Sequence, residues 1–395
     1  MPKTVILGAA RTPFGKMGGG LSSLDPTDLG GTAISAALER AEVAPEQVEH
    51  VVFGQVLQAG QGQIPSRQAQ IKADIPKEVS SETVNKVCAS GLRSAAIVDA
   101  YVRAGDLSGP AVAGGMESMS RAPYLLKDAR FGYRMGDAKA LDAMVHDGLT
   151  NPFTGKQMFV EATEVGDELE MSRPDMDKFA LRSHELAIKA TEEGRLPEEI
   201  VPVTVSSKKG DTTVEVDEGP RADSSLEKLA KLPGLTGPDG SHTAGNAPGV
   251  NDGAGALVLS SDEWAKQNDR KPLATIVGQA AVADDFAYLA RTPAAATRKA
   301  LEKAGLKIED IDLFEINEAF ASVAINSMRQ LGVGEDKVNV NGGAIALGHP
   351  IGASGARILT TLVHELRRRG GGLGVAAICS GGGQGDAVIV EVNGS

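Results

Sequence analysis

An internal repeat constrains the fold of this chain more than any other feature. The segment ALERAEV at residues 37–43 recurs as ALEKAGL at residues 300–306, an offset of 263 residues. The segment CASGLR at residues 88–93 recurs as GASGAR at residues 352–357, an offset of 264 residues. A third pair of apolar runs that end in glycine keeps the same chain order: residues 111–115 and residues 376–381. This pattern predicts two structurally equivalent halves.

Each half alternates short β-branched runs with longer amphipathic segments, which is typical of strands joined by crossover helices. We therefore predict an α/β fold. The chain has 395 residues, 42% of them hydrophobic, enough for two units with their own cores and an insertion. We assign residues 1–120 and 250–270 to the first half, residues 121–249 to the insertion, and residues 271–395 to the second half. Loops at strand ends carry the ligand sites of α/β proteins, so we expect the insertion to cover an active site.

Local signals place the turns of the repeat. Asp25-Pro26 and Thr292-Pro293 each read as a cap residue followed by proline at the first helical position. The pattern predicts a strand over residues 82–87 and a helix over residues 91–104, so that Cys88 lies in the turn between them. The equivalent turn of the second half spans residues 349–355. Within the insertion, a helix is predicted over residues 174–193.

Charge and composition exclude several classes of protein. A formal charge of −12 disfavours binding to nucleic acid or to anionic membranes, because both need clustered cations. The apolar runs are too short for a signal peptide or a membrane span, and the chain ends carry no recognisable targeting signal. We expect a cytoplasmic protein. The two cysteines are far apart and no metal-ligand spacing is present, so we expect neither a disulfide framework nor a metal.

The first candidate catalytic pair is Cys88 and His349. A cysteine at the start of a helix is favoured as the thiolate, its reactive form. His349 is held in a turn between Gly348 and Pro350, where it could accept the proton of the thiol. The alternative interpretations are a buried apolar cysteine and a structural turn histidine.

The second candidate group is Cys379 with the glycine-rich turn that follows it. Backbone N–H groups of Gly381 and its neighbours could point into a cavity and bind a developing oxyanion, although Cys379 could also be a packing residue. Asn317 is neutral and cannot act as a base, so its useful role would be to orient a water molecule or a donor.

Together these blocks resemble the thiolase family, in order and spacing, over essentially the whole chain. The blocks are NKVCASG at 85–91, NEAF at 317–320, GHPIG at 348–352 and CSGGGQG at 379–385, with RTPFG at 11–15, GGMESMS at 114–120 and GNA at 245–247 in support. The resemblance implies the thiolase fold: two repeated βαβαβαββ-type halves that form a five-layer αβαβα core with an inserted loop domain.

The resemblance also implies residue roles. Cys88 would be the nucleophile, His349 its base, and Cys379 a second thiol that removes the α-proton of an incoming acyl-CoA. Asn317 would pair with His349, and the backbone N–H groups of Cys88 and Gly381 would form an oxyanion hole.

Coenzyme A contacts follow from the same resemblance. The matching positions are Arg221, Lys228, Met158, Ala247, Ala319 and Phe320. For the two cations, the alternative is a solvated surface charge. Two positions depart from the family: Pro248 stands where serine is common, and Gln157 where short-chain enzymes often have histidine. Both leave the acyl-chain specificity open.

The activity implied is acyl transfer through an acyl-cysteine. Two molecules of acetyl-CoA would condense to acetoacetyl-CoA and CoA, or CoA would cleave a 3-ketoacyl-CoA in reverse, with no cofactor beyond these substrates. Alternatives are a degradative thiolase of broader chain length, a ketosynthase-like enzyme, which would not need Cys379, and a non-catalytic acyl-CoA carrier. The family implies a dimer or tetramer, for which residues 124–135 could be an assembly loop or only a surface lid.

Overall fold

The computed structural model describes residues 2–208 and 210–394. The first half forms a sheet in the order β4-β3-β5-β10-β1, in which β5, β3 and β4 are parallel and β10 is antiparallel to both of its neighbours. Its strands are β1 (Thr4–Arg11), β3 (His50–Gly54), β4 (Ser80–Val84), β5 (Ala111–Ser118) and β10 (Asn251–Ser261), and the short β2 (Gly15–Lys16) pairs with β10. Its helices are α1 (Pro26–Ala41), α2 (Pro65–Lys72), α3 (Ser90–Ala104) and α8 (Asp262–Gln267).

The second half repeats this order as β12-β13-β14-β11, with β12 parallel to β13 and the other pairs antiparallel. Its strands are β11 (Ala274–Ala283), β12 (Leu313–Ile316), β13 (Gly372–Ser380) and β14 (Gln384–Val392). Its helices are α9 (Thr292–Ala304), α10 (Ala321–Leu331), α11 (Ala344–Leu347) and α12 (Ser354–Arg368). The counterpart of β4 is reduced to an isolated bridge between Phe314 and Val338.

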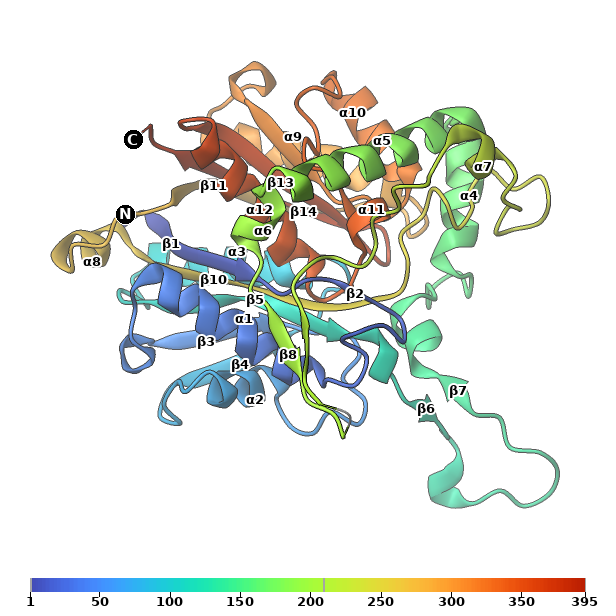
Figure 1. Cartoon of the computed structure of the whole chain (residues 1–395), viewed down its shortest axis with the longest axis horizontal. Coiled ribbons are helices and arrows are strands. Elements are labelled where there is room, and N and C mark those ends of the chain that lie inside the picture. Colours follow the sequence, from blue (N-terminus) through green and yellow to red (C-terminus); the bar gives the residue numbers. More distant parts are fainter. Residues whose placement is uncertain (1, 209, 395) are drawn as a thin grey trace.

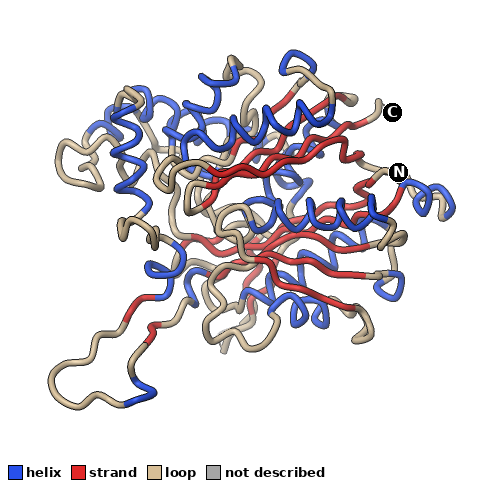
Figure 2. The backbone as a smooth tube through the Cα atoms, turned by 180° about the vertical axis from the view of Figure 1, so that it is seen from behind, coloured by secondary structure: helices blue, strands red, loops and turns tan. Residues whose placement is uncertain are grey.

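The two sheets join through their first strands, because residues 4–6 of β1 pair with residues 274–276 of β11. Helices cover both outer faces and also fill the space between the sheets, as Figure 2 shows. α1 packs on β1 and β10, α9 packs on β11 and β14, and α3 packs against α12 in the middle layer. The layers therefore run α-β-α-β-α, which is the five-layer order predicted from the sequence.

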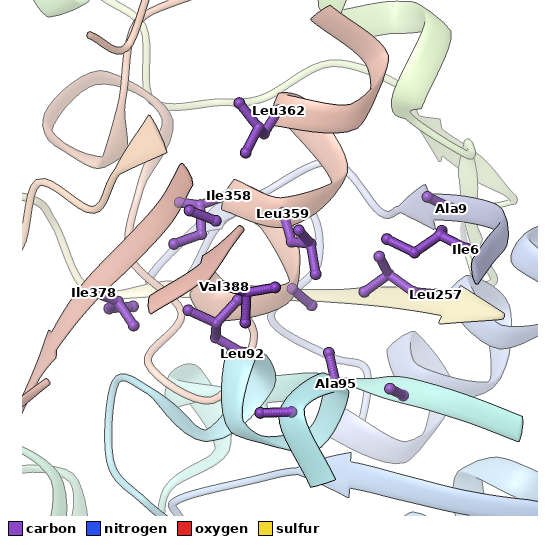
Figure 3. Close-up of a cluster of buried hydrophobic side chains, with 14 of the residues drawn as sticks. Ile6, Ala9, Leu92, Ala95, Leu257, Ile358, Leu359, Leu362, Ile378 and Val388 are labelled. Carbon is purple, nitrogen blue, oxygen red and sulfur yellow. The ribbon is translucent and has the colours of Figure 1, made fainter. Parts of the chain in front are cut away.

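The middle layer holds the largest apolar core. Leu92 and Ala95 of α3 meet Ile358, Leu359 and Leu362 of α12, with strands of both sheets on either side (Figure 3). All of these side chains are fully buried. Because one core serves both halves, the turns that begin α3 and α12 are brought together at one end of it.

Residues 121–249 contain the elements outside this core. They are β6 (Tyr124–Leu125), β7 (Leu141–Asp142), α4 (Met158–Glu168), α5 (Arg173–Glu192), α6 (Arg195–Glu199), β8 (Val203–Val205), β9 (Thr212–Val214) and α7 (Leu226–Ala230). β6 and β7 form the base of an arm that extends away from the body (Figure 1).

Several predicted boundaries shift. The strand expected over residues 82–87 is β4, which ends at Val84, because Asn85 and Lys86 already belong to the turn. α1 begins at Pro26 after Asp25 as predicted, whereas α9 begins at Thr292 itself, so that Thr292 is not its cap. The insertion helix begins at Arg173, one residue early, with Ser172 as its cap. No helix among the described residues has the length and apolar character needed to cross a membrane.

Candidate active site

Cys88 lies in the turn between β4 and α3 and is 5% exposed. Local hydrogen bonds shape this turn: the Lys86 N–H donates to Ser90 Oγ (2.8 Å), and Ser90 Oγ donates to the Val87 carbonyl (2.7 Å). Val87 has a φ of 43°, a left-handed conformation that is unusual for a β-branched residue. The nucleophile candidate therefore follows a strained residue in a well-bonded turn.

His349 lies in the equivalent turn, just before α12. Its backbone N–H donates to Asn251 Oδ1 (2.9 Å), and its Nδ1 lies 2.6 Å from Ser354 Oγ. Ser354 Oγ donates its own proton to the Pro350 carbonyl (3.0 Å), so it accepts from Nδ1–H. In neutral His349 this leaves Nε2 as an acceptor. Nε2 lies 3.5 Å from the Asn317 amide nitrogen.

Glycines allow the two turns to approach each other. A Cβ on Gly91 would lie 2.7 Å from the Ala356 nitrogen, and one on Gly355 would lie 2.2 Å from the Leu92 nitrogen. Both glycines follow the repeat-equivalent serines, Ser90 and Ser354. The repeat therefore includes the small residues that its own packing requires.

Cys379 lies near the end of β13 and is 1% exposed, and the turn from β13 to β14 follows it. Gly382 and Gly383 adopt positive φ values of 74° and 69°, which other residues avoid. A Cβ on Gly381 would lie 2.6 Å from the end of Met158 and 3.2 Å from Val87, so this turn packs directly on the nucleophile turn.

The two turns and Cys379 open onto one cavity of about 180 Å³. Eight predicted site residues line it: Cys88, His349, Cys379, Gly381, Met158, Ala247, Ala319 and Phe320. The remaining wall is mostly apolar and includes Met119, Leu149, Leu289 and Ile351, together with Gln157 and Pro248. Residues 121–249 contribute much of it, as expected of a segment that covers the site.

Three predicted residues do not line the cavity. Asn317 is fully buried behind His349, where its Oδ1 accepts from Arg357 Nη2 (3.5 Å). Arg221 is exposed; its backbone N–H donates to His184 Nδ1 (3.2 Å), and its carbonyl accepts from the Ser224 N–H (3.3 Å). Lys228 is exposed and pairs with Asp223 (2.7 Å). Among the described residues, no group of three or more His, Cys, Asp or Glu side chains could hold a metal.

Comparison with known proteins assigns nearly the whole chain to one family. The model of the thiolase N-terminal domain matches residues 4–263, and that of the thiolase C-terminal domain matches residues 270–392. The chain belongs to the thiolase family. The acetyl-CoA acetyltransferase of Syntrophomonas wolfei is 48% identical over 393 residues, 98% of this chain and 99% of the relative. That of Escherichia coli K12 is 46% identical over 392 residues, 99% of each chain. The crystal structure of the Bacillus anthracis acetyl-CoA acetyltransferase has a TM-score of 0.97 and 40% identity, covering 99% of both chains.

Burial sets the protonation states in the site of this thiolase. It raises the pKa of Cys88 to about 12, and the nearby Glu117 adds to the rise, whereas hydrogen bonds from the backbone N–H groups of Cys88 and Gly381 oppose it. The expected resting thiolate is therefore wrong, because desolvation outweighs the start of the helix. Burial likewise raises the pKa of Cys379 well above its usual value, and the charge of a Cys88 thiolate would raise it further. The site rests as two neutral thiols.

His349 is also neutral at rest. Burial lowers its pKa to about 3, and the Arg357 guanidinium contributes in the same direction. A neutral imidazole with Nδ1–H held by Ser354 presents the free lone pair of Nε2 on the side of Asn317. This is the tautomer that can accept a proton.

Sequence reasoning missed two residues that support this thiolase site. Ser354 holds His349, and the repeat could have revealed it, because Ser90 occupies the equivalent position beside Cys88. Glu117 accepts from the backbone N–H groups of Val56, Leu57 and Gly352 at 3.0–3.1 Å. Burial raises the pKa of Glu117 to about 7. The only sequence signal for Glu117 was its position in the block GGMESMS at residues 114–120, which resembles the thiolase family.

Proposed function

We propose that this thiolase is an acetyl-CoA acetyltransferase, which condenses two acetyl-CoA molecules to acetoacetyl-CoA and CoA and catalyses the reverse thiolysis. Relatives that share nearly half of its residues over the full length carry that name. The observation that supports the chemistry best is the convergence of Cys88, His349 and Cys379 on one small apolar cavity.

In the proposed first half-reaction, Cys88 attacks the thioester carbonyl while His349 Nε2 accepts the thiol proton. Because the thiol is neutral at rest, proton transfer and attack would be coupled. The backbone N–H groups of Cys88 and Gly381, which both donate toward the Cys88 sulfur, would bind the oxyanion that develops on the adjacent carbonyl. CoA leaves as a thiol after taking the proton of Cys379, and Cys88 carries the acetyl group while His349 keeps the proton it received.

In the second half-reaction, Cys379, now a thiolate because it has protonated the departing CoA, would remove a methyl proton from a second acetyl-CoA, whose carbanion attacks the acyl group on Cys88. We propose that His349 stabilises the enolate oxygen: Nε2 would donate the proton that it received from Cys88, and Asn317, held by Arg357 behind the imidazole, would orient this donor. Thiolysis is the same sequence in reverse.

We propose that Met158, Ala247, Ala319 and Phe320 contact the pantetheine and acyl parts of the substrate, since all four line the cavity. Arg221 and Lys228, which lie outside the cavity, would bind the phosphates of coenzyme A. The hydrogen bond from the Arg221 N–H to His184 Nδ1 would hold this segment in place. The cavity volume of about 180 Å³ favours a short acyl chain over the broader degradative alternative. The absence of any further cofactor and a cytoplasmic location stay predictions.

The partner of this chain is proposed to be a second copy of itself, in a dimer or tetramer. β4 lies at the end of its sheet with one edge unpaired in the described residues. The arm from β6 to β7 exposes large apolar side chains: Tyr124, Leu126, Phe131 and Met135 are 50–97% exposed. Light scattering of the protein and of Phe131→Asp with Met135→Asp tests the arm, and an unchanged mass would exclude it from assembly.

The experiment that tests the function is CoA-dependent cleavage of acetoacetyl-CoA by the purified protein, compared with 3-ketooctanoyl-CoA. Cleavage of acetoacetyl-CoA with a higher kcat/KM supports the proposal. Preference for the longer substrate would favour the degradative alternative. No cleavage, with stoichiometric acyl-CoA binding, would identify a carrier.

A further inference from the structure

We propose that Lys86 and Asp386 form a positioning pair, which holds the turn of Cys88 in register with the strands that carry Cys379 and the oxyanion-binding turn. The inference rests on the proposed function, because it takes Cys88 as the nucleophile. Neither side chain lines the cavity, so both would act through the residues they place.

The turn before Cys88 needs external support. Val87 adopts its φ of 43° only at a cost in free energy, so the surrounding contacts must hold it there. Ser90 Oγ accepts from the Lys86 N–H and donates to the Val87 carbonyl, and the Val87 N–H donates to Asn85 Oδ1 (3.1 Å). All three hydrogen bonds lie within the first half. They fix the shape of the turn but not its position relative to the second half.

Two contacts of Lys86 with the second half, one from its ammonium and one at its backbone carbonyl, help to set that position, beside the packing of the Gly381 turn on Val87. The Lys86 ammonium forms an ion pair with Asp386 Oδ1, and Ser380 Oγ donates to the Lys86 carbonyl. Ser380 follows Cys379 directly. Asp386 lies on β14 opposite Ile378, the residue before Cys379 on β13. The Ser380 contact therefore reaches β13, which carries the second thiol, and the Asp386 contact reaches β14, which pairs with it.

The surroundings of Asp386 make Lys86 the partner it requires. Its side chain is 3% exposed, and within the described residues its Oδ2 has no hydrogen-bond partner. Burial raises the pKa of Asp386, and the positive charges of Lys86 and Arg93 oppose this rise. Because a buried carboxylate is stable only when it is paired, removing the ammonium would release or protonate Asp386 and free the turn.

The consequence for catalysis is geometric. The N–H groups of Cys88 and Gly381 belong to different halves, and they can serve one oxyanion only if the halves are held in register. A displacement of about 1 Å in such a site costs about 100-fold in rate. We therefore expect the pair to influence kcat far more than KM.

The test uses the full-length protein with Lys86→Met, which keeps the aliphatic stem, Asp386→Asn, and the double variant. Each single change is expected to lower kcat for acetoacetyl-CoA thiolysis about 10- to 100-fold, with KM for CoA changed less than about 3-fold. The double variant should be no slower than the slower single variant, because both remove the same interaction. Lys86→Arg should recover most of the activity. Lys72→Met, which removes an exposed pair with Asp28, is the matched control and should keep the kcat of the unmodified enzyme.

The two proposals fail in different ways. If the unmodified enzyme does not cleave acetoacetyl-CoA, the proposed function fails before any variant is compared. If it is active and Lys86→Met or Asp386→Asn keeps its kcat, or if the losses add in the double variant, the positioning pair is refuted. A lower melting temperature with unchanged kcat assigns the pair to stability alone and equally refutes it. Should Lys86→Met not fold, Asp386→Asn, which is nearly isosteric, decides the question.

Discussion

Replacing Ser354 by alanine should slow the enzyme by removing control over the tautomer of His349. Ser354 Oγ accepts from His349 Nδ1 at 2.6 Å in a fully buried site. His349 is neutral at physiological pH, because its pKa is lowered to about 3 by burial and by Arg357. A neutral imidazole carries one proton, and Ser354 keeps that proton on Nδ1.

The magnitude follows from the loss of this acceptor. Leaving a buried donor without a partner costs about 1–3 kcal/mol, so the Nδ1–H tautomer is destabilised by that amount relative to Nε2–H. Since about 1.4 kcal/mol corresponds to tenfold in a rate, kcat should fall about 5- to 150-fold. KM should change little, because Ser354 does not line the cavity.

The assay is steady-state thiolysis of acetoacetyl-CoA, together with the rate of Cys88 alkylation by iodoacetamide at neutral pH. Both rates should fall, and neither should fall below the corresponding rate of His349→Ala. Ser327→Ala is a matched control: it also removes a buried hydroxyl, which donates to the Val323 carbonyl (2.7 Å) inside α10. A folded Ser354→Ala enzyme with kcat within about twofold of the unmodified enzyme, beside an inactive His349→Ala, would refute the tautomer argument.

Three further predictions concern the thiols, acid stability and packing. Cys88→Ala should abolish the acyl-enzyme seen by mass spectrometry, whereas Cys379→Ala should still be acetylated and yet fail to condense; an acetyl label on Cys88→Ala would contradict the roles proposed. Because the pKa of His349 is lowered in the folded state, the unfolded state binds the extra proton first, and stability falls as pH drops from about 6.5 toward 3. Between pH 7 and pH 5 the free energy of unfolding, measured with denaturant, should therefore fall by about 2 kcal/mol more in the unmodified enzyme than in His349→Asn. Equal falls in the two proteins would exclude this contribution of His349. Gly355→Ala should sharply reduce the yield of folded protein, since its Cβ would lie 2.2 Å from the Leu92 nitrogen, and a normal melting temperature would show that α3 and α12 can separate.

Much of the fold and part of the site could be predicted because their signals are local. The repeat, the alternation of strands and helices, and the turn positions of Cys88 and His349 depend on residues within a few places along the chain. Hydrophobic spacing, proline at a helix start and glycine in a turn act on their immediate neighbours, so the sequence displays them directly. The order of the polar blocks likewise determined the family.

The protonation states and the supporting contacts were decided only by the tertiary structure. The start of a helix predicted a thiolate at Cys88, but burial between two halves raises its pKa to about 12. Lys86 and Asp386 lie 300 residues apart, and no local pattern connects them. Arg221 carries the charge expected of a phosphate contact, yet it lies outside the cavity. Desolvation and ion pairing depend on which distant segments pack together, and that information exists only once the two halves share a core.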